Sequence, residues 1–126
     1  MKIKNRGDAI LYCRVSTSGQ VSGHGLQRQF EGGYKWAKEN GYNLISVFSE
    51  YGSDFNGKNR LKAREQAQYM ATSRDIPLLI EDLDRWSRDM ILPQCKLIVI
   101  GIGEDVEPVY YNCSNLPKVL TLINEN

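Results

Sequence analysis

The sequence predicts an α/β fold, with a mainly parallel sheet of four or five strands flanked by helices, in one domain over residues 1–126. Short apolar, β-prone runs alternate with stretches in which apolar residues recur near the helical period. Parallel neighbours need crossover connections, and the helical stretches supply them. At 126 residues, with 41% apolar and 25% charged residues, the chain can bury one sizeable core and is too polar for a membrane protein.

The first half of the chain contains a strand, a helix and a second strand. Residues 9–16 form an apolar run that becomes polar at its end, which is typical of a buried parallel strand with an exposed carboxyl-terminal tip. A loop with three glycines over 17–25 leads to a helix that Asn40-Gly41 ends, and a strand follows over 42–48. The apolar residues of this helix should face the sheet: Leu26, Phe30, Tyr34 and Ala37.

The second half repeats the alternation with shorter elements. A polar loop over 51–59 precedes a second helix, and 77–80 is a short buried strand with proline at its first position. The densest charge cluster of the chain, 81–89, comes next. The later predicted elements are strands over 96–100 and 108–111 and a terminal helix over 116–125. The apolar face of the second helix consists of Ala63, Ala67, Met70 and Ala71.

Polar residues follow three of the predicted strands. Arg14 and Ser16 end the first strand, the loop 51–59 follows the second, and the segment 84–88 follows the third. Ligands of parallel α/β sheets bind beyond the carboxyl ends of the strands. We therefore expect these three segments to meet at one edge of the sheet.

The residue types at this edge favour phosphoryl transfer. Ser16 and Arg14 are two apart, so in an extended strand their side chains share one face. A guanidinium fork matches two phosphate oxygens, and a serine hydroxyl is a poor nucleophile until its target is polarised. Arg85 and Arg88 are three apart and would be neighbours on one face of a helix. The alternatives are a surface Arg-x-Ser pair and a solvated helix start.

Charge and cysteine content exclude several classes of function. Sixteen basic and fifteen acidic side chains leave a net charge of +1, so any contact with a polyanion must be local. Three widely spaced cysteines and one histidine, His24, predict neither a disulfide framework nor a zinc site, and we expect no metal or cofactor. A cysteine phosphatase would need an arginine six positions after Cys13, where Gly19 stands. The apolar run 9–13 is too short for a signal peptide or a membrane span, which predicts a cytoplasmic protein.

Four blocks together resemble the catalytic domain of the serine recombinases, the resolvase and invertase family. They are residues 12–20 (YCRVSTSGQ), 26–29 (LQRQ), Gly52-Ser53 with Arg60, and 83–88 (LDRWSR). The blocks occur in the family's order with comparable gaps, and the resemblance covers about residues 8–90. It implies a resolvase-like catalytic domain.

The resemblance also implies a reaction. In that family the serine attacks a DNA backbone phosphate, forms a 5′-phosphoserine linkage and frees a 3′-hydroxyl without metal or ATP. Ser16 matches this serine. The partners implied are recombination-site DNA and a second copy of the chain, in dimers that join into tetramers, and no membrane.

The remaining site residues also follow from the resemblance. The arginines around the phosphate would be Arg14, Arg85, Arg88 and one from the loop before the second helix, for which we choose Arg60, with Arg64 as the alternative that would bind substrate. Asp84 would hold the arginines in place or help proton transfer to the leaving oxygen. Gln20 and Gln29 match glutamines near the family's active site, where they would bind substrate, and a structural role in a loop or helix cap is the alternative.

The chain departs from the family pattern after residue 90. In the family a long helix and a separate DNA-binding domain follow the catalytic sheet, whereas this sequence ends at Asn126, and Pro93 would cut short the helix that Arg85 begins. We expect either the amino-terminal fragment of a longer recombinase, which we favour, or a diverged stand-alone domain. The alternative function is a non-catalytic resolvase-like module that assembles with a recombinase or another regulator.

Overall fold

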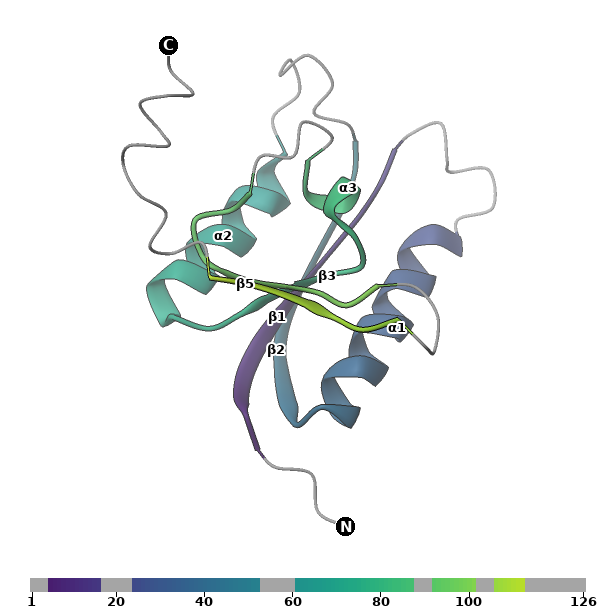
Figure 1. Ribbon diagram of the computed structural model, residues 1–126. Coiled ribbons are helices and arrows are strands. Elements are labelled where there is room, and N and C mark those ends of the chain that lie inside the picture. The colour runs from purple at the N-terminus through teal and green to yellow at the C-terminus, as the bar shows by residue number, and fades with distance from the viewer. Residues whose placement is uncertain (1–4, 17–23, 53–60, 88–91, 102–105, 113–126) are drawn as a thin grey trace.

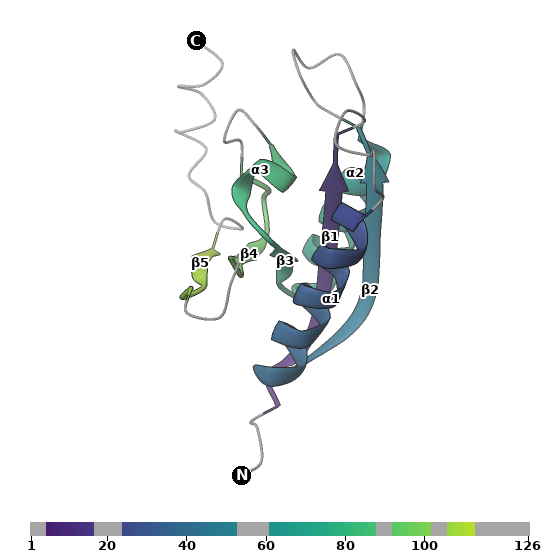
Figure 2. The ribbon, with the colours of Figure 1, turned by 90° about the vertical axis from the view of Figure 1, so that its right-hand side faces the viewer.

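A five-stranded sheet forms the centre of the computed structural model, which describes residues 5–16, 24–52, 61–87, 92–101 and 106–112 (Figure 1). The strand order is β2-β1-β3-β4-β5, and Figure 2 shows it from β5 at the left to β2 at the right. The first four strands are parallel, and β5 runs antiparallel to β4. The strands are β1 (Gly7–Val15), β2 (Tyr42–Tyr51), β3 (Leu78–Ile80), β4 (Lys96–Val99) and β5 (Val109–Asn112). The predicted α/β fold is confirmed.

Three helices cover the two faces of this sheet: α1 (His24–Glu39), α2 (Lys62–Arg74) and α3 (Leu83–Trp86). Because side chains alternate along a strand, β1 supplies both cores. Ile10 and Tyr12 pack with α2 and α3, whereas Leu11 and Cys13 pack with α1. Figure 1 shows α1 and α2 on opposite sides of β1 and β2. Arg14 continues the even-numbered series and therefore points to the side of α3.

The buried face of α1 differs from the predicted one. Phe30 and Tyr34 are 42% and 52% exposed and stack on each other, with ring centroids 6.1 Å apart. Two residues of the predicted face are confirmed, because Ala37 is buried and Leu26 packs against the same core. In place of Phe30 and Tyr34, the buried residues are Gln29 and Gly33, one position earlier in each case. The apolar period misplaced this part of the face because a polar side chain and a glycine occupy buried positions. Gln29 forms hydrogen bonds with the main chain of β1, and the missing side chain of Gly33 leaves room for Leu11.

Gly33 and its neighbour Gly32 provide a matched test of this packing. A Cβ on Gly33 would lie 2.6 Å from Leu11 Cδ1 and 3.1 Å from its Cγ, whereas a Cβ on Gly32 meets nothing within 4 Å. We expect Gly32→Ala to stabilise the protein by up to about 1 kcal/mol through helix propensity. Gly33→Ala should destabilise it by about 1–2 kcal/mol, because overpacking outweighs the same gain. Urea unfolding of both variants measures the difference, and equal stabilities would contradict this account.

The second half of the chain agrees with prediction in α2 and in the strands β3, β4 and β5. In α2, Ala67 and Ala71 are buried, and Ala63 and Met70 pack against the same core. The strand β2 runs to Tyr51, three residues beyond its predicted end. The predicted terminal helix 116–125 lies outside the described residues. No helix of the described part of the chain is long and apolar enough to cross a membrane.

The helix that was predicted to carry Arg85 and Arg88 together is shorter than expected. It is the single turn α3, which ends at Trp86, and Ser87 is extended with φ −157° and ψ 135°. Trp86 is 4% exposed and packs edge-on against Tyr12, with ring centroids 5.3 Å apart. The chain thus turns into the core instead of continuing as a helix. The described helix ends before Arg88, which lies outside the described residues, so the place of Arg88 beside Arg85 stays a prediction.

Candidate active site

Arg14, near the end of β1, forms hydrogen bonds that connect three segments of the chain. It is buried, with 4% of its surface exposed. Its guanidinium donates to three main-chain carbonyl oxygens: Nε to Arg85 at 2.9 Å, Nη1 to Gly52 at 2.8 Å and Nη2 to Asp84 at 2.5 Å. The ends of β1 and β2 therefore meet α3 at one edge of the sheet, as the topology predicted. Main-chain carbonyls thus accept from three of the five N–H groups of the Arg14 guanidinium. The contact of Arg14 with a phosphate stays a prediction.

Gln29 fixes the main chain of Arg14 from the opposite face. The amide of Gln29 is 2% exposed and makes a two-way contact. Its Oε1 accepts from Arg14 N at 3.1 Å, and its Nε2 donates to Arg14 O at 3.0 Å. This pairing continues the hydrogen-bond pattern of a strand and holds the chain two residues before Ser16. Its contact with substrate stays a prediction.

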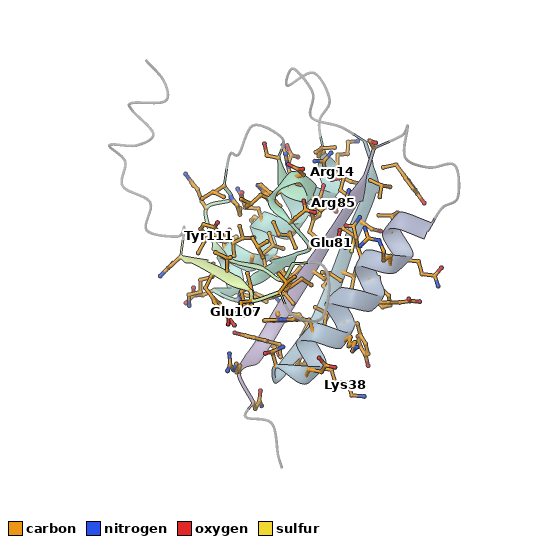
Figure 3. The ribbon with its side chains drawn as sticks, turned by 45° about the vertical axis from the view of Figure 1, so that its right-hand side comes forward. Arg14, Lys38, Glu81, Arg85, Glu107 and Tyr111 are labelled. Carbon is orange, nitrogen blue, oxygen red and sulfur yellow. The ribbon has the colours of Figure 1, made fainter. Side chains whose placement is uncertain are left out.

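Arg85 extends from α3 over the same edge, and Figure 3 shows it beside Arg14 and Glu81, at the end of the molecule away from Lys38. Its Nη1 donates to the carbonyl of Arg14 at 3.4 Å. Its Nε and Nη2 donate to Glu81 Oε1 at 3.4 and 3.3 Å. The guanidinium is therefore within hydrogen-bonding reach of the main chain that leads to Ser16.

Arg64 is positioned by a partly buried hydrogen-bond network at the start of α2. The Glu50 carboxylate accepts from the main-chain N–H groups of Ala63 and Arg64, at 3.1 and 2.9 Å, and so caps this helix. Tyr12 donates its hydroxyl proton to Glu50 Oε2 at 2.5 Å, and burial together with this carboxylate raises the pKa of Tyr12. The Arg64 guanidinium donates to the Trp86 carbonyl at 2.7 Å and lies 5.7 Å from the centre of the indole ring.

Ser16 follows β1 directly and is partly exposed. Asp84 is exposed, and its main-chain carbonyl accepts from the Arg14 guanidinium. The structure thus brings Arg14, Asp84 and Arg85 to the strand end that carries Ser16. Three predicted site residues lie outside the described residues: Gln20, Arg60 and Arg88.

The sequence of residues 9–98 matches the family model described as "Resolvase, N terminal domain". The chain belongs to this family. It is similar to the C-terminal catalytic domain of ISC1926 TnpA, an IS607-like serine recombinase, with 28% identity and a TM-score of 0.54 over 64% of this chain. It spans 55% of that domain's length. The N-terminal catalytic domain of TP901-1 integrase shares the fold, with 20% identity and a TM-score of 0.58 over 94% of each chain. No protein of curated function is a match in sequence.

Two carboxylates of this resolvase-family site were missed by sequence reasoning. Glu81 is 6% exposed and binds Arg28 and Arg85, and Glu50 caps α2. Glu81 directly follows β3 and Glu50 lies within β2, and both strands end at the edge of the candidate site. A charged residue at the carboxyl end of a buried strand was a usable signal for Glu81. Residues of the described segments form no group of three or more His, Cys, Asp and Glu side chains that could hold a metal ion.

Cys13 of the resolvase-family chain is buried in β1 next to Arg14. Burial, reinforced by the charge of Glu81 and opposed by Arg85, raises the pKa of the Cys13 thiol from 9.0 to about 12. A thiol reacts as the thiolate, so Cys13 is a poor nucleophile at neutral pH. This agrees with the exclusion of a cysteine phosphatase.

The raised pKa predicts slow alkylation of Cys13. At pH 8 the folded protein should react with iodoacetamide at Cys13 about 1000-fold more slowly than the urea-unfolded protein, because the shift is from 9.0 to about 12. The folded state keeps a proton that the unfolded state loses above pH 9, so stability should also fall as pH rises from 9 toward 12. Mass spectrometry of the Cys13 peptide measures the rate. Equal rates in the two states would show that the thiol is not protected.

Proposed function

We propose that this chain is the catalytic domain of a site-specific DNA recombinase and that Ser16 is its nucleophile. The observation that supports this most directly is the clustering of Arg14, Asp84 and Arg85 around the strand end that carries Ser16. A phosphoryl centre under attack carries negative charge on its equatorial oxygens, and prearranged cations stabilise that charge. Membership of the resolvase family supports a DNA phosphodiester as the substrate class.

The proposed reaction exchanges one phosphoester bond for another. The Ser16 hydroxyl loses its proton as Oγ bonds to phosphorus, and the bond from phosphorus to the 3′ oxygen breaks. That oxygen takes up a proton and leaves as a 3′-hydroxyl, while the phosphate stays joined to Ser16 and to the 5′ oxygen. The reverse step, with a new 3′-hydroxyl as the attacking group, rejoins a strand. Because the ester bond is conserved, the reaction needs no ATP, and in this proposal arginines stabilise the phosphoryl charge in place of a metal ion.

The arginines would divide two tasks. Arg85 keeps N–H groups available at the site edge and would bind the phosphate, together with Arg88 and Arg60, which lie outside the described residues. Arg14 would contribute mainly by fixing the main chain of the site, and Arg64 by supporting α3 through the Trp86 carbonyl. Asp84, exposed at the same edge, is the candidate to pass a proton to the leaving oxygen. Gln29 would hold the strand, and Gln20 would contact substrate.

The proposed partners are recombination-site DNA and further copies of the chain. The family assembles as dimers that join into tetramers on DNA, and strand exchange needs two duplexes held together. In the described part of the site, arginines are matched by carboxylates, Glu50, Glu81, Asp82 and Asp84, so bulk charge would add little to DNA affinity. A region that binds DNA would therefore have to assist the domain.

Trapping the covalent intermediate tests this function. Nicked duplexes tiled across the DNA that flanks the gene would serve as probes, because the short fragment with the 3′-hydroxyl dissociates after attack and the adduct accumulates. The full-length gene product should form an adduct in which mass spectrometry locates the 5′-phosphate on Ser16. An adduct on another residue would refute the assignment. No adduct on DNA that the protein binds would favour the non-catalytic module.

A further inference from the structure

Glu81 is a buried carboxylate between two arginines at the edge of the candidate active site. It directly follows β3, and its side chain is 7% exposed. Arg28 from α1 pairs with both of its oxygens, with Nη2 at 3.0 Å from Oε1 and Nη1 on Oε2. Arg85 from α3 shares Oε1. A buried carboxylate is costly unless it is paired and hydrogen-bonded. The two arginines supply the ion pairs and hydrogen bonds that offset the cost of burying Glu81.

The contacts of Arg85 are confined to part of its guanidinium. Glu81 Oε1 accepts from Nε and Nη2, which form one edge of the group, and the Arg14 carbonyl accepts from Nη1. Three of the five N–H groups are thus used, and two have no partner among the described residues. The side chain is 26% exposed. The Arg85 guanidinium is therefore hydrogen-bonded along one edge, and its remaining N–H groups can donate to an anion.

Arg28 limits how far Glu81 neutralises Arg85. Its bidentate contact engages both carboxylate oxygens, whereas Arg85 reaches only one of them, at longer distances. Asp82 forms a longer ion pair with Arg85, from Oδ2 to Nε at 3.8 Å, while its Oδ1 accepts from the Asp84 N–H. Glu81 can therefore orient Arg85, while Arg28 compensates most of the negative charge of the Glu81 carboxylate.

We propose that Glu81 is a positioning residue, which holds Arg85 by one edge of the guanidinium so that its remaining N–H groups are set to bind the DNA phosphate. This inference rests on the proposed function. It assigns to Glu81 and Arg28 a role in cleavage without contact with the reacting atoms. It predicts that binding and cleavage respond differently when Glu81 loses its charge.

The Glu81→Gln variant tests this separation. Glutamine keeps the shape and an acceptor oxygen but not the charge, so Arg85 loses its ionic anchor. Cleavage of the nicked duplex should slow about 10- to 100-fold, as when a group that orients a site residue is removed. Affinity for a generic duplex should stay equal or rise, because one negative charge near the phosphate is gone. The matched control is Glu39→Gln, which makes the same charge change at the exposed far end of α1 and should cleave like the unsubstituted chain.

The outcomes separate this inference from the proposed function. Unchanged cleavage in Glu81→Gln, or parallel losses of cleavage and affinity, would overturn the positioning role. If the full-length gene product forms no adduct on DNA that it binds, the proposed function fails, and nuclear magnetic resonance still decides the role of Glu81. Rotation of the Arg85 guanidinium about its Nε–Cζ bond should be slow in the unsubstituted chain and fast in Glu81→Gln, with the signal assigned by Arg85→Lys. Equal rotation rates would overturn the inference, and unfolding curves would show that both proteins are folded.

Discussion

The Ser16→Ala variant should form no covalent adduct with nicked DNA, a loss of at least about 1000-fold relative to the unsubstituted chain. Alanine has no oxygen that can bond to phosphorus, and prearranged cations cannot replace a nucleophile. The fold should remain, because Ser16 follows the last residue of β1 and is partly exposed. The free energy of unfolding of the Ser16→Ala variant should differ from that of the unsubstituted chain by no more than about 1 kcal/mol. Adduct yield on a denaturing gel and urea unfolding measure the two effects.

A second serine provides the control for this experiment. Ser73 lies near the end of α2, is exposed, and donates to the Met70 carbonyl at 3.3 Å. Ser73→Ala removes the same hydroxyl group away from the candidate site and should give the full adduct yield. DNA affinity should be similar in both variants, since neither removes a charge. An adduct that persists in Ser16→Ala would mean that another residue attacks the phosphate.

The fold was predictable because it depends on patterns that are local in sequence. The apolar run of β1 and the small residues of α2 show their periods within ten or so positions, and the alternation of these elements predicts a parallel sheet. The error in α1 has the same origin. Its buried stripe includes Gln29 and Gly33, whose fit depends on β1 and not on their own hydropathy.

The candidate site was predictable in its location but not in its contacts. Parallel topology places the ends of β1 and β2 and the start of α3 at one edge, so Ser16, Asp84 and Arg85 could be assigned there. The pairing of Arg28 with Glu81 joins residues 53 positions apart, and no spacing rule predicts it. The contact of Arg14 with a phosphate stays a prediction, whereas the hydrogen bonds of its guanidinium to main-chain carbonyls beneath α3 were not predicted. Such contacts depend on tertiary packing, which a single sequence does not display.

The other large effect should follow from Arg14→Met, which we expect to lower the unfolding free energy by about 3–5 kcal/mol. Methionine fills a similar volume but donates no hydrogen bond. The carbonyls of Gly52, Asp84 and Arg85 would then lose a charged donor in a site where Arg14 is only 4% exposed. Urea unfolding measures the loss. Arg6→Met is the control, because Arg6 is exposed, and its stability should change by less than about 0.5 kcal/mol.

Hydrogen exchange would locate the damage caused by Arg14→Met within the sheet. The Gly52 N–H donates to the Val15 carbonyl at 2.9 Å beside the lost guanidinium, whereas the Ile10 N–H donates to the Pro77 carbonyl at 3.0 Å in the first half of β1. Protection should fall most at Gly52, because local opening needs only the strand end to separate, while exchange at Ile10 requires more of the sheet to open. If both amides lose protection equally, Arg14 supports the fold as a whole. Selective loss at Gly52 would identify Arg14 as the residue that holds the candidate active site together.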